Sequence, residues 1–193
     1  MSRHETASQT AGPYVHIGCL PNQSGISGVY PYDLGTRPIA DDTQGTRITV
    51  HGTIFDGTGA PVKDAMIETW QADAAGRYAT TAAGFTGWGR HAADADTGLW
   101  QIQTIKPGAI VQDTGPDMAP HITLWIVARG LNIGLHTRMY FPQDTAAHAI
   151  DPVLAHIQDP THRQTLVATD VKPGQYRFDI HLQGPQETVF FDV

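Results

Sequence analysis

Cysteine is nearly absent from this 193-residue sequence, in which Cys19 stands alone. A single cysteine excludes an intramolecular disulfide and a zinc site built on cysteine pairs, and suits a reducing compartment. Long apolar runs are also missing. The N-terminal Met1–Glu5 opens no apolar signal segment, and no later run approaches the ~20 residues of a membrane-spanning helix. We therefore expect a cytoplasmic protein without a membrane segment.

Charge is sparse and acidic overall. Charged residues make up 16% of the sequence against 40% hydrophobic residues, and the net charge is −7. This balance is typical of a globular protein, and it leaves no basic surface for nucleic acid. The length suits one domain with a full core.

The chain divides into two regions. Residues 1–45 show no helical or strand periodicity, and residues 21–38 are rich in glycine and proline, with one asparagine. This composition predicts an extended N-terminal arm, because the segment has too little apolar content to fold alone. We expect the arm to dock on its own domain or on a neighbouring chain. In residues 46–193, apolar and polar residues alternate regularly over short segments, and this region is the predicted folded domain.

Short alternating segments between glycine, proline and aspartate turns predict the strands. Asp56-Gly57 ends the first of them, and Ala65–Trp70 is predicted to return beside it. Such a pattern indicates a mainly β chain, an antiparallel β-sandwich, with one short helical insertion near residues 145–157. The expected strands cover residues 47–55, 65–70, 99–105, a strand from 121, 135–141, 165–168, 175–182 and 187–191.

The strand that opens at His121 carries the first candidate site. Side chains alternate along a strand, so His121, Thr123 and Arg129 share one side. A His-x-His pair would aim two imidazoles at one metal ion, but threonine takes the second place here. Arg129 lies about 26 Å from His121 along a straight strand. It therefore pairs with a local carboxylate or serves a site elsewhere, such as one on another subunit.

Other residues give weaker signals. The ten histidines never show His-x-His or His-x-x-x-His spacing, and there is no phosphate-binding glycine loop or Gly-x-Ser-x-Gly motif. Tyr78 follows a turn, where a tyrosine is usually a packed aromatic with its hydroxyl at the surface. A lone histidine such as His121 is likewise usually a hydrogen-bonded or surface histidine. Taken by themselves, these residues indicate no more than a β-sandwich.

The order of several short motifs adds a family resemblance. The chain resembles the intradiol ring-cleavage dioxygenases nearly from end to end. The resemblance lies in residues 8–14 (SQTAGPY), 70–73 (WQAD), 76–78 (GRY), 104–108 (TIKPG), 118–122 (MAPHI), 128–130 (ARG), 135–141 (LHTRMYF), 176–179 (YRFD) and 187–191 (ETVFF).

Catalytic members of that family bind non-haem Fe(III) through two tyrosinates and two histidines. Residue by residue, the resemblance matches Tyr78 to the first tyrosine and His121 to the first histidine. The second tyrosine is Ile110 here, and the second histidine is Thr123. The family's arginine before the first histidine is Met118. With two of four ligands lost, the resemblance implies a vestigial site that does not hold iron.

Arg138 stands where catalytic chains carry glutamine. A guanidinium near Tyr78 would replace part of the lost metal charge. The alternative is a solvent-facing strand arginine, which is the commoner case.

The resemblance also implies a partner. In the two-chain members, a homologous catalytic beta chain holds the Fe(III), and the alpha chain helps to wall the substrate pocket beside it. The matching residues here are Thr10, Gly12, Pro13 and Arg129, and the arm would dock on the partner. The implied reaction is the cleavage of protocatechuate with O2 to 3-carboxy-cis,cis-muconate, in a hetero-oligomer of αβ units.

Two other classes stay open at this point. One is a non-catalytic β-sandwich used for binding or structure. The other is a self-sufficient dioxygenase whose altered metal site recruits His136 or another histidine.

Overall fold

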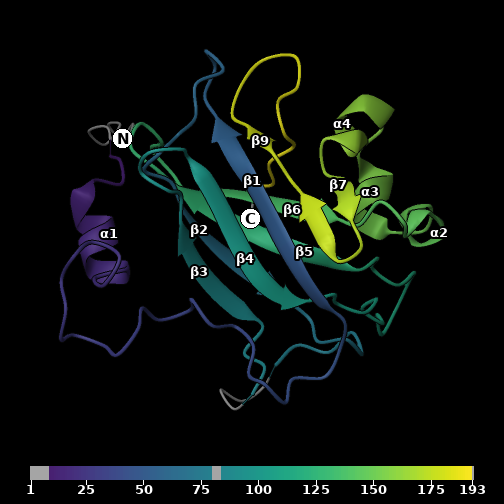
Figure 1. Ribbon diagram of the computed structural model, residues 1–193. Coiled ribbons are helices and arrows are strands. Elements are labelled where there is room, and N and C mark those ends of the chain that lie inside the picture. The colour runs from purple at the N-terminus through teal and green to yellow at the C-terminus, as the bar shows by residue number, and fades with distance from the viewer. Residues whose placement is uncertain (1–8, 80–83, 193) are drawn as a thin grey trace, which may run out of the picture.

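Two β-sheets packed face to face form the centre of the computed structural model, which describes residues 9–79 and 84–192 (Figure 1). The sheets confirm the predicted sandwich. The first has the order β4 (Leu99–Ile105), β1 (Arg47–Phe55), β8 (Gln175–Arg177), β7 (Thr169–Lys172), with β9 (Ile180–His181) beside β1. The second has the order β3 (Trp88–Ala92), β2 (Met66–Gln71), β5 (His121–Val127), β6 (Leu135–Tyr140).

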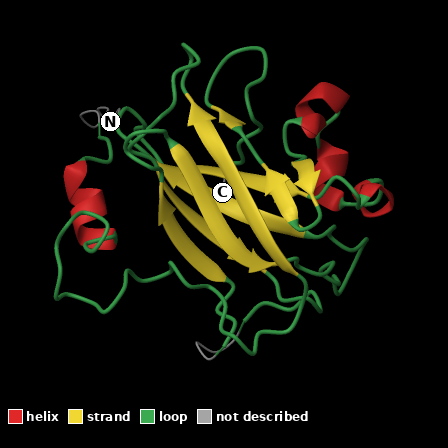
Figure 2. Cartoon of the chain, viewed as in Figure 1, coloured by secondary structure: helices red, strands yellow, loops and turns green. Residues whose placement is uncertain are grey.

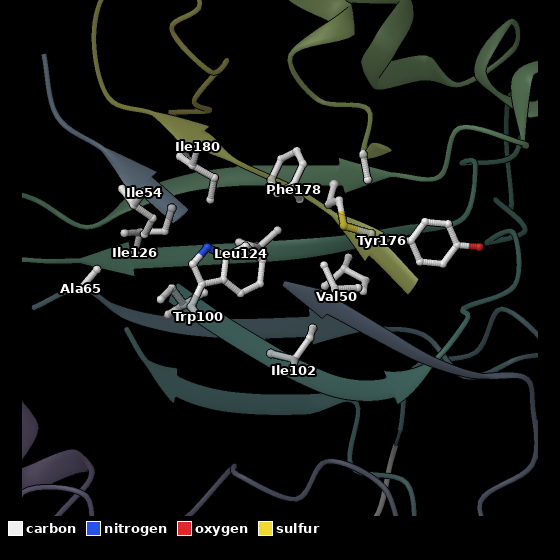
Figure 3. Close-up of a cluster of buried hydrophobic side chains, with 14 of the residues drawn as sticks. Val50, Ile54, Ala65, Trp100, Ile102, Leu124, Ile126, Tyr176, Phe178 and Ile180 are labelled. Atoms are coloured by element: carbon white, nitrogen blue, oxygen red, sulfur yellow. The ribbon is translucent and has the colours of Figure 1, made fainter. Parts of the chain in front are cut away.

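The core lies between the sheets (Figure 3). Alternation in β1 turns Val50 and Ile54 inward, and Trp100 of β4 faces Leu124 and other residues of the second sheet. Gly52 has a special place in β1, because a Cβ there would lie 1.9 Å from the carbonyl oxygen of Phe178. A larger residue would therefore push the segment between β8 and β9 away from the sheet.

The pairing of the first two strands differs from the prediction. β1 has the predicted bounds, but β2 does not return beside it. β1 pairs with β4 over residues 47–53, whereas β2 pairs with β3 and β5 in the other sheet. The two segments meet only at an isolated bridge between Phe55 and Pro61, where the N–H of Val62 donates to the carbonyl of Ile54 at 2.8 Å. Beyond this bridge the chain crosses to the second sheet, where β2 begins at Met66.

Several smaller elements also differ from the prediction. β3 and β7 were not expected, and residues 175–182 divide into β8 and β9. Residues 165–168 and 187–191 form isolated bridges rather than strands. The helical insertion becomes α2 (Thr145–His148), α3 (Pro152–His156) and α4 (Pro160–Gln164). Asp151 and Asp159 cap α3 and α4, each followed by proline in the first turn, which ends one helix and starts the next.

The arm is not wholly extended. It contains α1 (Pro13–Cys19), which lies on the opposite side of the sandwich from α2–α4 (Figures 1 and 2). Residues 1–8 of the arm, including Ser8 of the SQTAGPY motif, lie outside the described residues. The arm packs on its own domain, since the backbone N–H of Arg90 in β3 donates to the carbonyl of Gly35 at 2.9 Å. In the described part of the chain, no helix is long and apolar enough to cross a membrane.

Candidate functional site

One end of the second sheet brings strand residues of the predicted vestigial site together on its outer face. Thr123 of β5 lies directly opposite Arg138 of β6, and His121 lies opposite Tyr140. On its other side, Thr123 pairs with Trp70 of β2. The inward face of the same strands, at Ile122 and Met139, belongs to the core.

Loops add the remaining residues. Tyr78 stacks on Trp70 with ring centroids 5.8 Å apart and planes 9° apart. Ile110 and Met118 exchange two backbone hydrogen bonds of 2.9 and 3.0 Å. Met118 in turn reaches β6, because its Sδ lies 3.5 Å from Nη1 of Arg138.

Gly76 explains how the Tyr78 turn reaches the Ile110 segment. Its φ is +77°, and a Cβ there would lie 1.8 Å from the carbonyl oxygen of Ala109. The close approach therefore needs glycine. Through these contacts, the structure gathers the six positions that the resemblance assigned to the vestigial site.

Arg138 sets the charge of this cluster. It is half-buried rather than solvent-facing, and its guanidinium lies 6.0 Å from the ring of Phe191. Burial raises the pKa of Tyr78, and the positive charge of Arg138 partly offsets that rise. Burial is the main cause that lowers the pKa of His121 to about 4, and the positive charge of Arg138 is the second. At neutral pH the cluster therefore holds a neutral phenol, a neutral imidazole and one cation.

Two buried residues, Asp151 and Tyr140, contact the cluster from the protein interior, and sequence reasoning did not identify them as site residues. The fully buried carboxylate of Asp151 accepts from the hydroxyl of Tyr140 at 3.3 Å and from the N–H of Ala119 at 2.8 Å. The carbonyl of Ala119 contacts Nδ1 of His121 at 2.8 Å. Asp151-Pro152 is a recognisable helix start, and Tyr140 has the same alternation as Arg138, so both signals were present in the sequence.

The six residues of the predicted vestigial site do not fit a ferric ion. Tyr78 and His121 are the only oxygen or nitrogen donors of the required kind among the six positions, and Arg138 brings positive charge to the same place. His136, the alternative ligand, lies beside Trp125 with ring centroids 6.4 Å apart. No three His, Cys, Asp or Glu side chains form a metal-binding group within residues 9–79 and 84–192. We therefore assign no chemical step to a metal in this chain.

A second cluster lies at the other end of β5 and contains the residues predicted to act in trans. β5 ends at Val127, so Arg129 lies in the following turn and not in the strand. The hydroxyl of Thr10 accepts from the N–H of Gly130 at 2.8 Å and donates to the carbonyl of Ala128 at 3.3 Å. The arm is thus tied to both sides of Arg129.

The rest of that cluster follows from the same contact. Gly12 and Arg129 line one cavity of about 340 Å³, and Pro13 begins α1 directly after Gly12. Arg129 also forms an ion pair with Asp64, with Nε 3.1 Å from Oδ2. The local carboxylate considered for Arg129 is therefore present, but the side chain of Arg129 remains 74% exposed.

Comparison with known sequences identifies the family of this chain. The family model described as Dioxygenase matches residues 30–184. The chain belongs to the intradiol ring-cleavage dioxygenase family. Within it, the chain is 44% identical over 195 residues to the protocatechuate 3,4-dioxygenase alpha chain of Pseudomonas putida, covering 97% of this chain and 96% of that protein.

Two further sequences extend the comparison. The protocatechuate 3,4-dioxygenase alpha chain of Burkholderia cepacia is 40% identical, with 98% of each chain covered. The protocatechuate 3,4-dioxygenase beta chain of the same organism is 32% identical, covering 83% of this chain and 75% of that protein. The chain is therefore similar to both subunits of the relatives, and it matches the alpha chains over more of its length.

Solved structures show the same fold. The 3-chlorocatechol 1,2-dioxygenase of Rhodococcus opacus 1CP has a TM-score of 0.60 at 23% identity, over 75% of this chain and 62% of that one. The dioxygenase domain of a carbohydrate-binding fusion from Streptomyces sp. SirexAA-E has a TM-score of 0.57 at 24% identity, over 84% and 95%.

Proposed function

We propose that this chain is the alpha subunit of a hetero-oligomeric intradiol dioxygenase that cleaves protocatechuate with O2 to 3-carboxy-cis,cis-muconate. Its partner is a homologous beta chain that holds the Fe(III). The observation that carries the proposal is the full-length similarity to alpha chains, together with a site whose residues do not fit a ferric ion. The single cysteine suits the cytoplasm as its compartment.

The chain would act on the substrate through the second cluster, the corner formed by Arg129 with Thr10, Gly12 and Pro13. Protocatechuate carries a carboxylate, and a guanidinium offers it charge and paired hydrogen bonds. Thr10 and Gly12 lie beside Arg129, and the fixed φ of Pro13 shapes the wall without added bulk. The iron of the partner would activate the catechol ring, and this chain would orient the ring by its carboxylate.

The arm would provide the docking surface for the partner, with residues 46–193 as the supporting domain. Half of the large exposed apolar side chains in the described part of the chain lie between residues 14 and 34. They are Tyr14, Ile17, Ile26, Val29, Tyr30, Tyr32 and Leu34. Exposed tyrosine and aliphatic side chains of this kind are common in protein interfaces.

Iron content and visible absorbance test the proposal. The chain is purified alone and then with its co-expressed homologous beta chain. Tyrosinate bound to ferric iron absorbs visible light, so we expect colour and stoichiometric iron only in the complex. Colour in the isolated chain would favour a self-sufficient dioxygenase. Failure of any homologous partner to co-purify would favour a non-catalytic β-sandwich.

A further inference from the structure

We propose that Asp64 is a positioning residue that holds the guanidinium of Arg129 in place for the substrate carboxylate. The inference rests on the proposed function and names a residue that the family resemblance does not assign. Asp64 lies just before β2, whereas Arg129 lies in the turn after β5, so the pair joins two adjacent strands at one end of the sandwich.

The ion pair with Asp64 involves the Nε side of the Arg129 guanidinium. Asp64 contacts Arg129 through Nε, at 3.1 Å. A guanidinium has a second edge formed by its two Nη groups, which suits a carboxylate in the two-bond arrangement. Asp64 thus lies beside Nε, and within residues 9–79 and 84–192 the two Nη groups form no hydrogen bond, so a ligand carboxylate can approach them.

The surroundings show why such a tether is needed. Arg129 and Asp64 line two different cavities at once. One, of about 340 Å³, is bounded by Gly12 and other arm residues. The other, of about 940 Å³, is an open groove with Leu131 and Phe190 in its wall. An untethered, 74% exposed arginine could lie in either space, and the contact with Asp64 keeps it at their boundary beside the arm.

The backbone and the side chain of Arg129 are held by different contacts. Thr10 bonds to Ala128 and Gly130 and fixes the turn. Asp64 fixes the side chain that projects from it. Pre-organising a flexible arginine lowers the entropy lost when it binds a carboxylate. The negative charge of Asp64 opposes the substrate charge, but it lies on the far edge of the guanidinium and is screened by solvent.

The test uses the co-expressed, iron-loaded complex with Asp64→Ala, Asp64→Asn and the control Asp113→Ala, which removes an exposed aspartate from the loop before β5. For Asp64→Ala we expect KM for protocatechuate to rise about fivefold, with kcat and the KM for catechol changed less than twofold. Asp64→Asn keeps the side-chain shape and one oxygen beside Nε, so its KM should rise less than twofold. Asp113→Ala should leave every constant unchanged. The melting temperature of each complex checks assembly.

Each other result overturns the proposal in a distinct way. A lower KM in both Asp64 variants would mean that Asp64 competes with the substrate. Equal rises for protocatechuate and catechol would mean a structural role. If Arg129→Ala weakens protocatechuate use while Asp64→Ala has no effect, the positioning role fails and the proposed function stands. If Arg129→Ala also has no effect, the substrate role of this corner fails with it.

Discussion

Met118 lies against Arg138, with Sδ 3.5 Å from Nη1, and this contact joins the loop after Ile110 to β6. A soft thioether and a guanidinium meet where a metal site would need hard anionic donors. Met118 thus offers no hard donor to a metal ion, and the positive charge of Arg138 repels a cation.

This arrangement predicts the outcome of rebuilding an iron site. Ile110→Tyr with Thr123→His restores the two missing donors, but the positive charge of Arg138 remains. We expect the isolated double variant to bind far less than one iron per chain. Adding Arg138→Gln should raise iron content and visible tyrosinate absorbance. Stoichiometric iron in the double variant would show that Arg138 does not oppose the metal.

Arg129→Ala should weaken the use of protocatechuate in the complex by about 1.5–3 kcal/mol, the range for a hydrogen bond to a charged group, or roughly ten- to a hundredfold in kcat/KM. Catechol, which lacks the carboxylate, should change far less. Arg77→Ala is a matched control, because Arg77 is also an exposed arginine paired with an aspartate. Equal losses on both substrates would remove Arg129 from recognition.

Thr10→Val keeps the side-chain shape but removes the hydroxyl that bonds to both Ala128 and Gly130. Each bond contributes about 0.5–1.5 kcal/mol. We expect KM for protocatechuate to rise about three- to tenfold and amide exchange at Gly130 to speed up. Thr10→Ser retains the hydroxyl and should match the parent. If the valine variant matches it too, the arm is held by other contacts.

Buried histidines predict an acid-sensitive fold. Burial lowers the pKa of His91 and His121 to about 4, against an ordinary value of 6.5. The unfolded chain therefore binds more protons between pH 6.5 and about 4, and stability falls as the pH drops through this window. Each histidine contributes up to about 1.4 kcal/mol per pH unit. Urea unfolding at pH 7, 6 and 5 measures the slope, which His121→Asn should reduce. An unchanged slope would contradict the assignment to His121.

Gly76→Ala should destabilise the domain more than Gly115→Ala. Both glycines have positive φ, +77° and +87°, so both substitutions strain the backbone by about 1 kcal/mol. A Cβ at Gly76 also meets the carbonyl oxygen of Ala109, whereas at Gly115 it meets nothing within 4 Å. The clash should add roughly 3 kcal/mol. Thermal or urea unfolding of both variants compares them, and equal losses would mean that the Tyr78 turn shifts freely.

Local pattern was enough for much of the fold. The bounds of β1 and β4 were predicted from alternation, because each has one face in the core and one outside. β3 was missed because Trp88–Ala92 contains a glycine, an arginine and a histidine, and its polar side chains face partners across the sheet. Arg90, for example, lies 2.6 Å from Glu68 of β2, a contact that no local pattern reveals.

The candidate site divides in the same way. The sequence by itself determined which donors are present: a tyrosine, a histidine, and isoleucine, threonine and methionine at the remaining positions. Residue identity fixes donor chemistry, so the poor fit of these residues to a ferric ion could be predicted without coordinates. Only the tertiary structure decided that Arg138 lies against Met118 and that Asp64 and Thr10 hold Arg129. Such contacts join segments 20 to 120 residues apart, and their positions depend on how the strands pair and where the turns end.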